Sequence, residues 1–260
     1  MNRKYRKAII AGNWKMNKTA SETVAFVNAL KPLLPKERSC EVLLCVPALN
    51  ITTAQKALKG CRIGVGAENV HEETAGAFTG ETSAAMLADL GVKYVIIGHS
   101  ERRQYYHETD ITVNRKLRTA LDAGLSPIVC VGESSEQREL GVENELLSYQ
   151  LMTAIAGLSA AELRRVIVAY EPVWAIGTGK TATAEQAQAV CAHLRGCIRA
   201  RFDARVARAI PILYGGSMNQ DNAAQLLAMP DIDGGLIGSA ALQPREFVNL
   251  ITICGQVEHA

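Results

Sequence analysis

Three side chains of this 260-residue sequence could together carry out a proton transfer. They are the Glu171 carboxylate, the His99 imidazole and the Lys15 amine. Glu171 ends an apolar run, where a carboxylate without a partner or a role costs free energy. Pro172 restricts the backbone of Glu171 to extended conformations and so fixes the direction of the carboxylate. His99 also closely follows an apolar run. A base, an imidazole and a cation are together suited to general acid–base chemistry.

Small residues follow the last two apolar runs, as Gly215-Gly216-Ser217 and Gly238-Ser239. Before a helix, such a loop can present backbone N–H groups to a phosphate, although two glycines could equally form a simple turn. Taken alone, a lysine is usually a solvated charge and a histidine is usually structural. The hypothesis of a site therefore depends on elements that bring these residues together.

Eight short apolar runs predict the strands, and most of them are rich in Val and Ile and lack period-2 alternation. This pattern is typical of strands buried on both faces of a parallel sheet. The runs are residues 8–11, 42–46, 63–65, 94–97, 128–131, 166–170, 210–214 and 236–237.

Helical patterns lie between the runs. Capping boxes predict one helix from Thr19 to about Leu34 and another that begins after Thr183. The second has one apolar face, formed by Ala187, Val190, Cys191, Leu194 and Ile198. Two shorter segments are expected to end at Gly91 and Gly124, with inward-facing side chains at Met86, Leu87, Leu90, Leu117 and Leu121.

Alternating strands and helices predict an α/β fold with a parallel sheet, either a closed (β/α)₈ barrel or an open doubly wound sheet. Eight units in this length favour the barrel. No linker or shift in composition divides the chain, so residues 1–260 are expected to form a single domain. In both architectures the chemistry lies at the carboxyl ends of the strands. The residues named above should therefore converge on one rim.

The composition is that of an ordinary soluble globular protein, with 48% apolar residues and 28 basic against 26 acidic residues. These values exclude disorder, collagen-like repeats and a disulfide miniprotein. The formal charge of +2 gives no electrostatic reason to expect nucleic acid or an anionic membrane as a partner.

The apolar run at residues 8–11 is too short for a signal peptide, and no stretch is long enough to span a membrane. Seven cysteines without a CxxC pair indicate reduced thiols and a cytoplasmic location.

Other catalytic motifs fail at defined positions. A P-loop ending at Gly179-Lys180-Thr181 requires glycine where the chain has Trp174. Gly98-His99-Ser100 fails as a nucleophile elbow because Arg102 stands where glycine is required. No HExxH motif or spaced Cys/His cluster suggests a metal site.

Several segments, in order and at the expected spacing, resemble the triosephosphate isomerase family. The segments are Asn13-Trp14-Lys15, Gly76-Ala77-Phe78-Thr79-Gly80-Glu81, Gly98-His99-Ser100-Glu101-Arg102-Arg103, Ala169-Tyr170-Glu171-Pro172-Val173-Trp174-Ala175-Ile176-Gly177-Thr178-Gly179-Lys180 and Tyr214-Gly215-Gly216-Ser217. The resemblance implies a TIM barrel that interconverts dihydroxyacetone phosphate and glyceraldehyde 3-phosphate, without a cofactor or metal. It also implies a homodimer formed through the loop Gly76–Glu81.

The resemblance implies a role for each site residue. Glu171 would be the base, and His99 would polarise the substrate oxygens and shuttle their proton. Lys15 would offset negative charge, Asn13 would orient the substrate and Glu101 would support the site. A lid at residues 172–180 would close over the substrate. Phosphate contacts would come from Gly177, Ser217, Gly238 and Ser239. A helix beginning at residues 100–102 would place its positive end near His99.

The chain departs from the family pattern at three positions. Ser239 replaces a common glycine, and it would be strained if the backbone there needs a positive φ. Ala241 replaces a serine, and Glu68 replaces a usual glutamine and so could alter the field around Lys15 or the subunit contact.

Two other functions remain open from the sequence. One is a non-catalytic phosphate-binding relative, which would have no need of a base such as Glu171. The other is a different phosphosugar isomerase or epimerase, against which the sequence of the lid argues.

Overall fold

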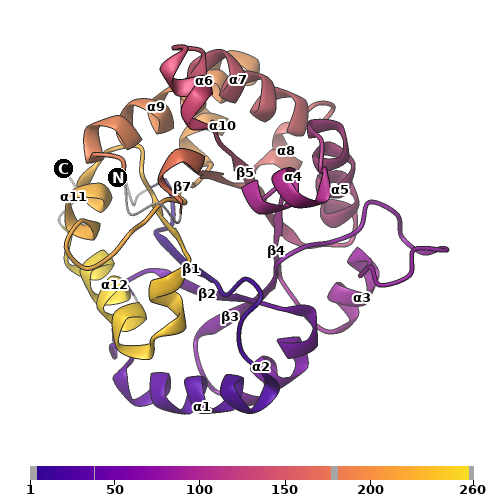
Figure 1. Ribbon diagram of the computed structural model, residues 1–260, viewed down its shortest axis with the longest axis vertical. Helices are drawn as coiled ribbons and strands as arrows, with labels where there is room; N and C mark the ends of the chain where they lie inside the picture. The colour runs from indigo at the N-terminus through magenta and orange to yellow at the C-terminus, as the bar shows by residue number, and fades with distance from the viewer. Residues whose placement is uncertain (1–4, 38, 177–180, 258–260) are drawn as a thin grey trace.

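The computed structural model describes residues 5–37, 39–176 and 181–257. Its eight strands pair in parallel in the order of the chain, and β1 also pairs with β8, so that the sheet closes. The helices surround this barrel (Figure 1). The prediction of a (β/α)₈ barrel is confirmed, and the open doubly wound sheet is excluded.

The elements alternate along the chain, with some additional short helices in the connections. The strands are β1 Ile9–Asn13, β2 Glu41–Val46, β3 Ile63–Ala67, β4 Tyr94–Ile97, β5 Ser126–Val131, β6 Ile167–Tyr170, β7 Ile212–Tyr214 and β8 Gly234–Ile237. The α-helices are α1 Ala20–Leu30, α2 Ile51–Ala57, α3 Ala84–Asp89, α4 Ser100–Tyr106, α5 Asp110–Asp122, α6 Ser135–Glu139, α7 Glu143–Ala154, α8 Ala160–Leu163, α9 Ala184–Arg201, α10 Ala204–Ala209, α11 Ala223–Ala228 and α12 Pro244–Gln256. Short 3₁₀ helices are η1 Lys31–Leu33, η2 Ala48–Asn50, η3 Val173–Ala175 and η4 Ser239–Leu242.

Two apolar layers form because successive side chains of a strand point to opposite faces. Ile9 and Ala11 belong to the cluster inside the barrel, whereas Ile10 belongs to the cluster between the barrel and the helices. The inner cluster also contains Ile167 and Ala169 of β6. Two residues further along each of these strands come Asn13 and Glu171. The alternation that builds the core therefore directs both side chains into the mouth of the barrel.

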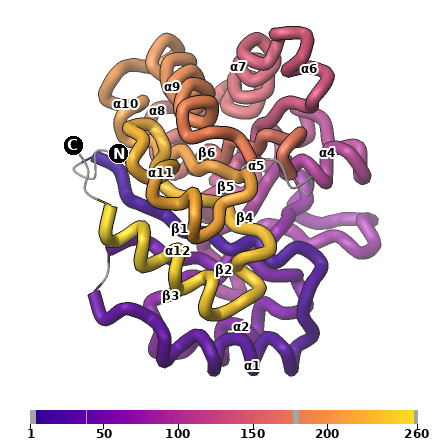
Figure 2. The backbone as a smooth tube through the Cα atoms, turned by 60° about the vertical axis from the view of Figure 1, so that its left-hand side comes forward, coloured from indigo at the N-terminus to yellow at the C-terminus, as the bar shows by residue number. Residues whose placement is uncertain are grey.

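Both capping boxes that the sequence predicts are present, at Thr19 of α1 and Thr183 of α9. The apolar face expected on α9 is buried in full. Helix α4 ends at its C-cap residue, His107. The ring of helices closes where the last helix, α12, lies beside the first, α1 (Figure 2). In the described part of the chain, no helix combines the length and apolarity needed to cross a membrane.

Two local predictions are wrong. Met86 and Leu90 are exposed, because the buried stripe of α3 consists of Ala84 and Leu87, three residues apart. The last strand begins at Gly234, earlier than predicted. The prediction missed this start because the first two residues of the strand are glycines, which do not extend the apolar run.

All seven cysteines are thiols and none forms a disulfide, as predicted from the absence of paired spacing. Five of them are buried, and Cys61 and Cys197 are partly exposed.

Candidate active site

A base and an imidazole meet at the carboxyl ends of the strands. Glu171 follows β6 and His99 follows β4, and Glu171 Oε1 lies 2.8 Å from His99 Nε2. Both residues are buried, and both line a cavity of about 470 Å³. The structure therefore brings together two groups that are 72 positions apart in the sequence.

The Glu171 carboxylate is held in its present position by two contacts. Oε2 accepts a 2.9 Å hydrogen bond from the Ser100 N–H, while Oε1 faces the imidazole. Burial alone would raise the pKa of Glu171, but the neighbouring His99, the Ser100 N–H and the Lys15 ammonium together lower it. In this position the carboxylate is ionised and is therefore able to accept a proton.

Two glycines, Gly132 and Gly215, allow neighbouring main chain to approach Glu171 closely. A Cβ at position 132 would lie 2.0 Å from the carbonyl oxygen of Glu171, and one at position 215 would lie 2.9 Å from its Cγ. Neither contact is possible for a larger residue without movement of the main chain or the base. Gly132 and Gly215 therefore help to define where the carboxylate can sit.

His99 is the N-cap of α4, which confirms the prediction that a helix begins at residues 100–102. Its Nδ1 accepts a 3.2 Å hydrogen bond from the Glu101 N–H, so the proton of a neutral ring lies on Nε2, facing Glu171. Burial alone would lower the pKa of His99, but the Glu171 carboxylate and, to a smaller extent, the Glu101 carboxylate together outweigh burial and raise it. The charge state of the ring thus depends on whether Glu171 stays beside it.

A cation completes the group. Lys15 Nζ lies 2.7 Å from Glu101 Oε1, and the backbone N–H of Lys15 donates to Asn13 Oδ1 at 3.2 Å. Lys15 has a φ of 54°, in the left-handed region that non-glycine residues rarely occupy. Such strain is retained where the surrounding structure requires it, and here it turns the side chain toward the cavity that Asn13 and His99 also line.

Small residues of two loops line the same cavity. They include Ser217 after β7, and Gly238 and Ser239 after β8. Ser239 begins the short helix η4 and does not have a positive φ, so no backbone strain of that kind arises at this position. Gly177, the fourth predicted phosphate contact, lies outside the described residues.

One buried residue of this region was missed by the sequence analysis. The Glu133 carboxylate accepts hydrogen bonds from the Tyr170 hydroxyl at 2.9 Å and the Trp174 indole N–H at 2.7 Å. It also forms a 3.0 Å ion pair with Arg138. Glu133 stands two residues after β5, so the rule that identified Glu171 after β6 could have identified it as well.

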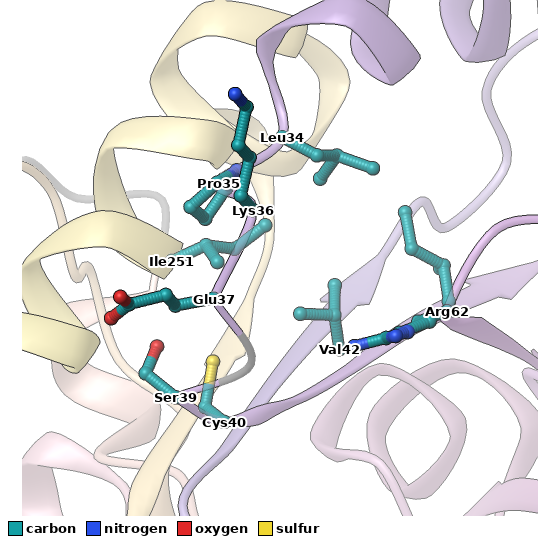
Figure 3. A pocket seen from close by; sticks show the side chains of 10 residues that line it. Leu34, Pro35, Lys36, Glu37, Ser39, Cys40, Val42, Arg62 and Ile251 are labelled. Atoms are coloured by element: carbon teal, nitrogen blue, oxygen red, sulfur yellow. The ribbon is translucent and has the colours of Figure 1, made fainter.

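A second hollow lies at the opposite end of the strands, near the beginnings of β2 and β3 (Figure 3). It encloses only about 60 Å³ and is lined by the side chains of Leu34, Val42 and Ile251 with Lys36, Glu37 and Arg62. No described histidine lines it, so it lacks the pairing of base and imidazole found at the carboxyl ends. Within the described ranges, no three His, Cys, Asp or Glu side chains are grouped so as to hold a metal ion.

Comparison with known proteins points to one family over nearly the whole chain. The family model described as "Triosephosphate isomerase" matches residues 8–254. The chain is 56% identical to a triosephosphate isomerase of Acetivibrio thermocellus over 93% of its own length and 96% of the relative. It is 51% identical to the enzyme of that name from Lactiplantibacillus plantarum, over 95% and 98% of the two chains. A Solibacter usitatus relative of the same name is 50% identical over 95% and 99%. A match of this extent and identity shows that the chain belongs to the triosephosphate isomerase family.

Proposed function

We propose that this protein interconverts dihydroxyacetone phosphate and glyceraldehyde 3-phosphate by proton transfer through an enediolate. The observation that carries the proposal is the contact between the buried Glu171 carboxylate and His99 Nε2, in a cavity that Lys15 and Asn13 also line. A binding protein would need the phosphate contacts but not a buried base. No observation favours a second function.

Glu171 is the proposed base. It removes a proton from the substrate carbon beside the carbonyl and returns it to the neighbouring carbon. Carbon acids of this kind are weak, so the base needs help from groups that stabilise the enediolate oxygens. His99 Nε2–H and the Asn13 amide are proposed to donate to these oxygens, and Lys15 to offset their charge. Glu101 is proposed to hold Lys15 in place, which the 2.7 Å ion pair between them supports.

Substrate binding would separate Glu171 from His99. The carboxylate would then leave the His99 ring and the Ser100 N–H, which both lower its pKa. Its basicity would therefore rise when it reaches the substrate carbon. His99 would at the same time lose the carboxylate that raises its pKa, which favours the neutral ring as the donor. Triosephosphate isomerase is the known example of a neutral histidine electrophile near a helix N-terminus, and the present contact of Nδ1 with the Glu101 N–H fits that form.

The phosphate group is proposed to bind the backbone N–H groups of Ser217, Gly238 and Ser239, with Gly177 added from the lid. The first three line the cavity, and Lys15 lines it as well. Backbone N–H groups of short loops suit a phosphate because several can converge on it without a bulky side chain between them.

The segment from Pro172 to Lys180 is proposed to act as a lid that excludes water. Its beginning is attached to Glu133, whose carbonyl accepts the Val173 N–H at 3.1 Å and whose carboxylate accepts the Trp174 N–H. Exclusion of water would strengthen the electrostatic interactions at the enediolate and would prevent loss of its phosphate.

The protein is further proposed to be a cytoplasmic, single-domain homodimer. The loop between β3 and α3 projects from the body of the molecule (Figure 1). Phe78 in this loop is exposed, and Met16 and Leu49 elsewhere on the same end are almost fully exposed. A cavity of about 350 Å³ beside the active site, lined by Met16, Glu68 and Gly80 among others, would receive apolar side chains of a second copy. Seven thiols without a disulfide support a reducing compartment.

A coupled assay tests the proposed reaction. Purified protein is given glyceraldehyde 3-phosphate, and the formation of dihydroxyacetone phosphate is followed through its reduction by a second enzyme. We expect turnover from the natural chain and almost none from Glu171→Gln, which keeps the shape of the side chain but cannot accept the proton. Absence of turnover in the natural chain, with the fold intact by circular dichroism, would refute the proposal.

A further inference from the structure

A cluster of nucleophilic and basic side chains lies outside the active site, between two neighbouring helices. Helices α7 and α9 pack beside each other in the outer ring (Figure 1). Ser148 projects from α7, and His193 and Cys197 project from one face of α9, one turn apart. All three residues are partly exposed, so the cluster is reachable from solvent.

The three side chains contact one another. The Ser148 Oγ lies 2.7 Å from His193 Nε2 and 3.3 Å from Cys197 Sγ. Cys197 Sγ lies 3.6 Å from the same Nε2 atom. The thiol therefore has an imidazole and a hydroxyl as immediate neighbours.

The hydrogen bonds indicate where the protons lie. The Ser148 hydroxyl donates to the Asn144 carbonyl oxygen at 2.7 Å. His193 Nε2 lies 2.7 Å from the Ser148 Oγ and 3.1 Å from the same carbonyl oxygen, which can only accept, so Nε2 carries a proton. When the thiol loses its proton, this Nε2–H also faces the sulfur, and the hydroxyl hydrogen can rotate from Asn144 toward it. An imidazolium and a hydroxyl donor both stabilise a thiolate, which is the nucleophilic form of cysteine.

The other cysteines provide the contrast. Burial raises the pKa of the Cys45, Cys130 and Cys191 thiols, which favours the unreactive protonated form. Cys61 is partly exposed like Cys197, but none of the described histidines contacts it. Cys61 is therefore a matched internal control for the effect of the imidazole.

We propose that Cys197 is an activated thiol and the site at which this protein forms mixed disulfides with small disulfides. The Cys197 thiolate attacks one sulfur of the small disulfide, a new S–S bond forms, and the other sulfur leaves as a thiolate that takes up a proton. The Cys197 thiol releases its proton to solvent, and the Nε2–H of His193 faces the resulting thiolate. The two electrons that reduce the leaving sulfur come from the Cys197 thiolate, so no further oxidant is needed.

The test measures the reaction of each cysteine separately. The native protein is incubated at pH 7 with oxidised glutathione, and in a parallel sample with iodoacetamide, and peptide mass spectrometry follows Cys197 and Cys61. We expect Cys197 to react about tenfold faster than Cys61 with both probes. Equal rates at the two cysteines would overturn the proposal.

Two variants test the roles of the neighbours. His193→Gln keeps a side-chain donor to Ser148 but, unlike an imidazole, cannot become a cation beside the sulfur, so the rate at Cys197 should fall about tenfold, to that of Cys61. Ser148→Ala should lower the same rate by about threefold, because one donor to the sulfur is lost. An unchanged rate at Cys61 and unchanged isomerase turnover show that the fold is intact. If His193→Gln leaves the ratio of the two rates unaltered, the imidazole does not activate the thiol and the proposal is wrong.

Discussion

Glu171 and His99 lie beside each other in the present structure, and this pairing contributes to their opposite pKa shifts. The carboxylate raises the pKa of the imidazole, and the imidazole contributes to the lowered pKa of the carboxylate. A substrate that enters between them would remove both effects at once. Under the proposed mechanism, Glu171 would therefore become a stronger base when substrate arrives.

Glu68 is a second carboxyl group near the site, partly buried, and it provides a prediction for the dependence of stability on pH. Burial and then the nearby Glu101 raise the pKa of Glu68 to about 8, although the Lys15 N–H and ammonium oppose this. Between pH 4.5 and pH 8 the unfolded chain releases a proton that the folded chain retains, so stability falls as pH rises. We expect Glu68→Gln to raise the unfolding free energy at pH 9, on the order of 2 kcal/mol after allowance for partial exposure, and to change little at pH 4.

Urea denaturation of the two proteins at pH 4, 6, 8 and 9 measures this effect. The exposed Glu73 of the same loop provides the control, because Glu73→Gln should leave the pH profile as it is. A gain from Glu68→Gln that is equal at all four pH values would contradict the account.

At the residue level, the sequence predicts which side chains face the cavity but not their partners. Asn13, His99 and Glu171 could be found because each stands at the carboxyl end of a strand whose apolar run is visible. The contact of Glu133 with Trp174 joins two loops, and no spacing rule brings an indole N–H onto a given carboxylate. The cluster at Cys197 could likewise be predicted only in part. The spacing of His193 and Cys197 places them on one helix face, but it does not predict their contact with Ser148 of another helix.

At the scale of elements, Glu133 connects the end of β5 to the end of β6, to the beginning of the proposed lid and to α6. Tyr170, Trp174 and Arg138 all contact the same carboxylate oxygen. Because Glu133 is fully buried, its charge is tolerated only with these partners.

We expect Glu133→Gln to lower the unfolding free energy by about 2 kcal/mol, because Arg138 loses its counterion and the amide cannot satisfy all the donors. Chemical denaturation at pH 7 provides the measurement. Glu136→Gln, which changes an exposed acidic residue of α6, is the control and should alter stability by less than about 0.5 kcal/mol. Equal stabilities of the two variants would show that the Glu133 network does not hold these elements together.

The beginning or end of a helix or strand can be predicted only where nearby side chains mark it, as a capping box does. The capping boxes at Thr19 and Thr183 are local, and both helices begin where the sequence places them. The strand β8 begins with two glycines, so its start depends on pairing with β1 and not on its own residues. The apolar side chain of Met86 predicts a buried position. In α3, however, adjacent residues face different directions, so Leu87 is buried and Met86 is exposed to solvent.

At the scale of the whole molecule, the exposed apolar side chains at the β3–α3 loop form the basis of the homodimer proposal. Phe78→Asp places a charge in this loop and should shift the protein toward a monomer in sedimentation velocity at micromolar concentration. Leu140→Asp is a matched control, because Leu140 is also exposed but lies after α6, away from this loop. It should sediment like the natural chain.

A natural chain that sediments as a fully active monomer would contradict the proposed dimer. It would leave the proposed reaction intact, because every group with a proposed catalytic role belongs to one chain. The two proposals therefore succeed or fail separately.

The most direct test of the account is the turnover number of Glu171→Asp. Shortening the side chain withdraws the carboxylate by about one carbon–carbon bond while its charge and its neighbours remain, so a role as base predicts a fall of about 100-fold or more. Stability should change little, because the carboxylate can still accept a hydrogen bond within the same cavity. A folded Glu171→Asp protein with an unchanged turnover number would show that Glu171 is not the base.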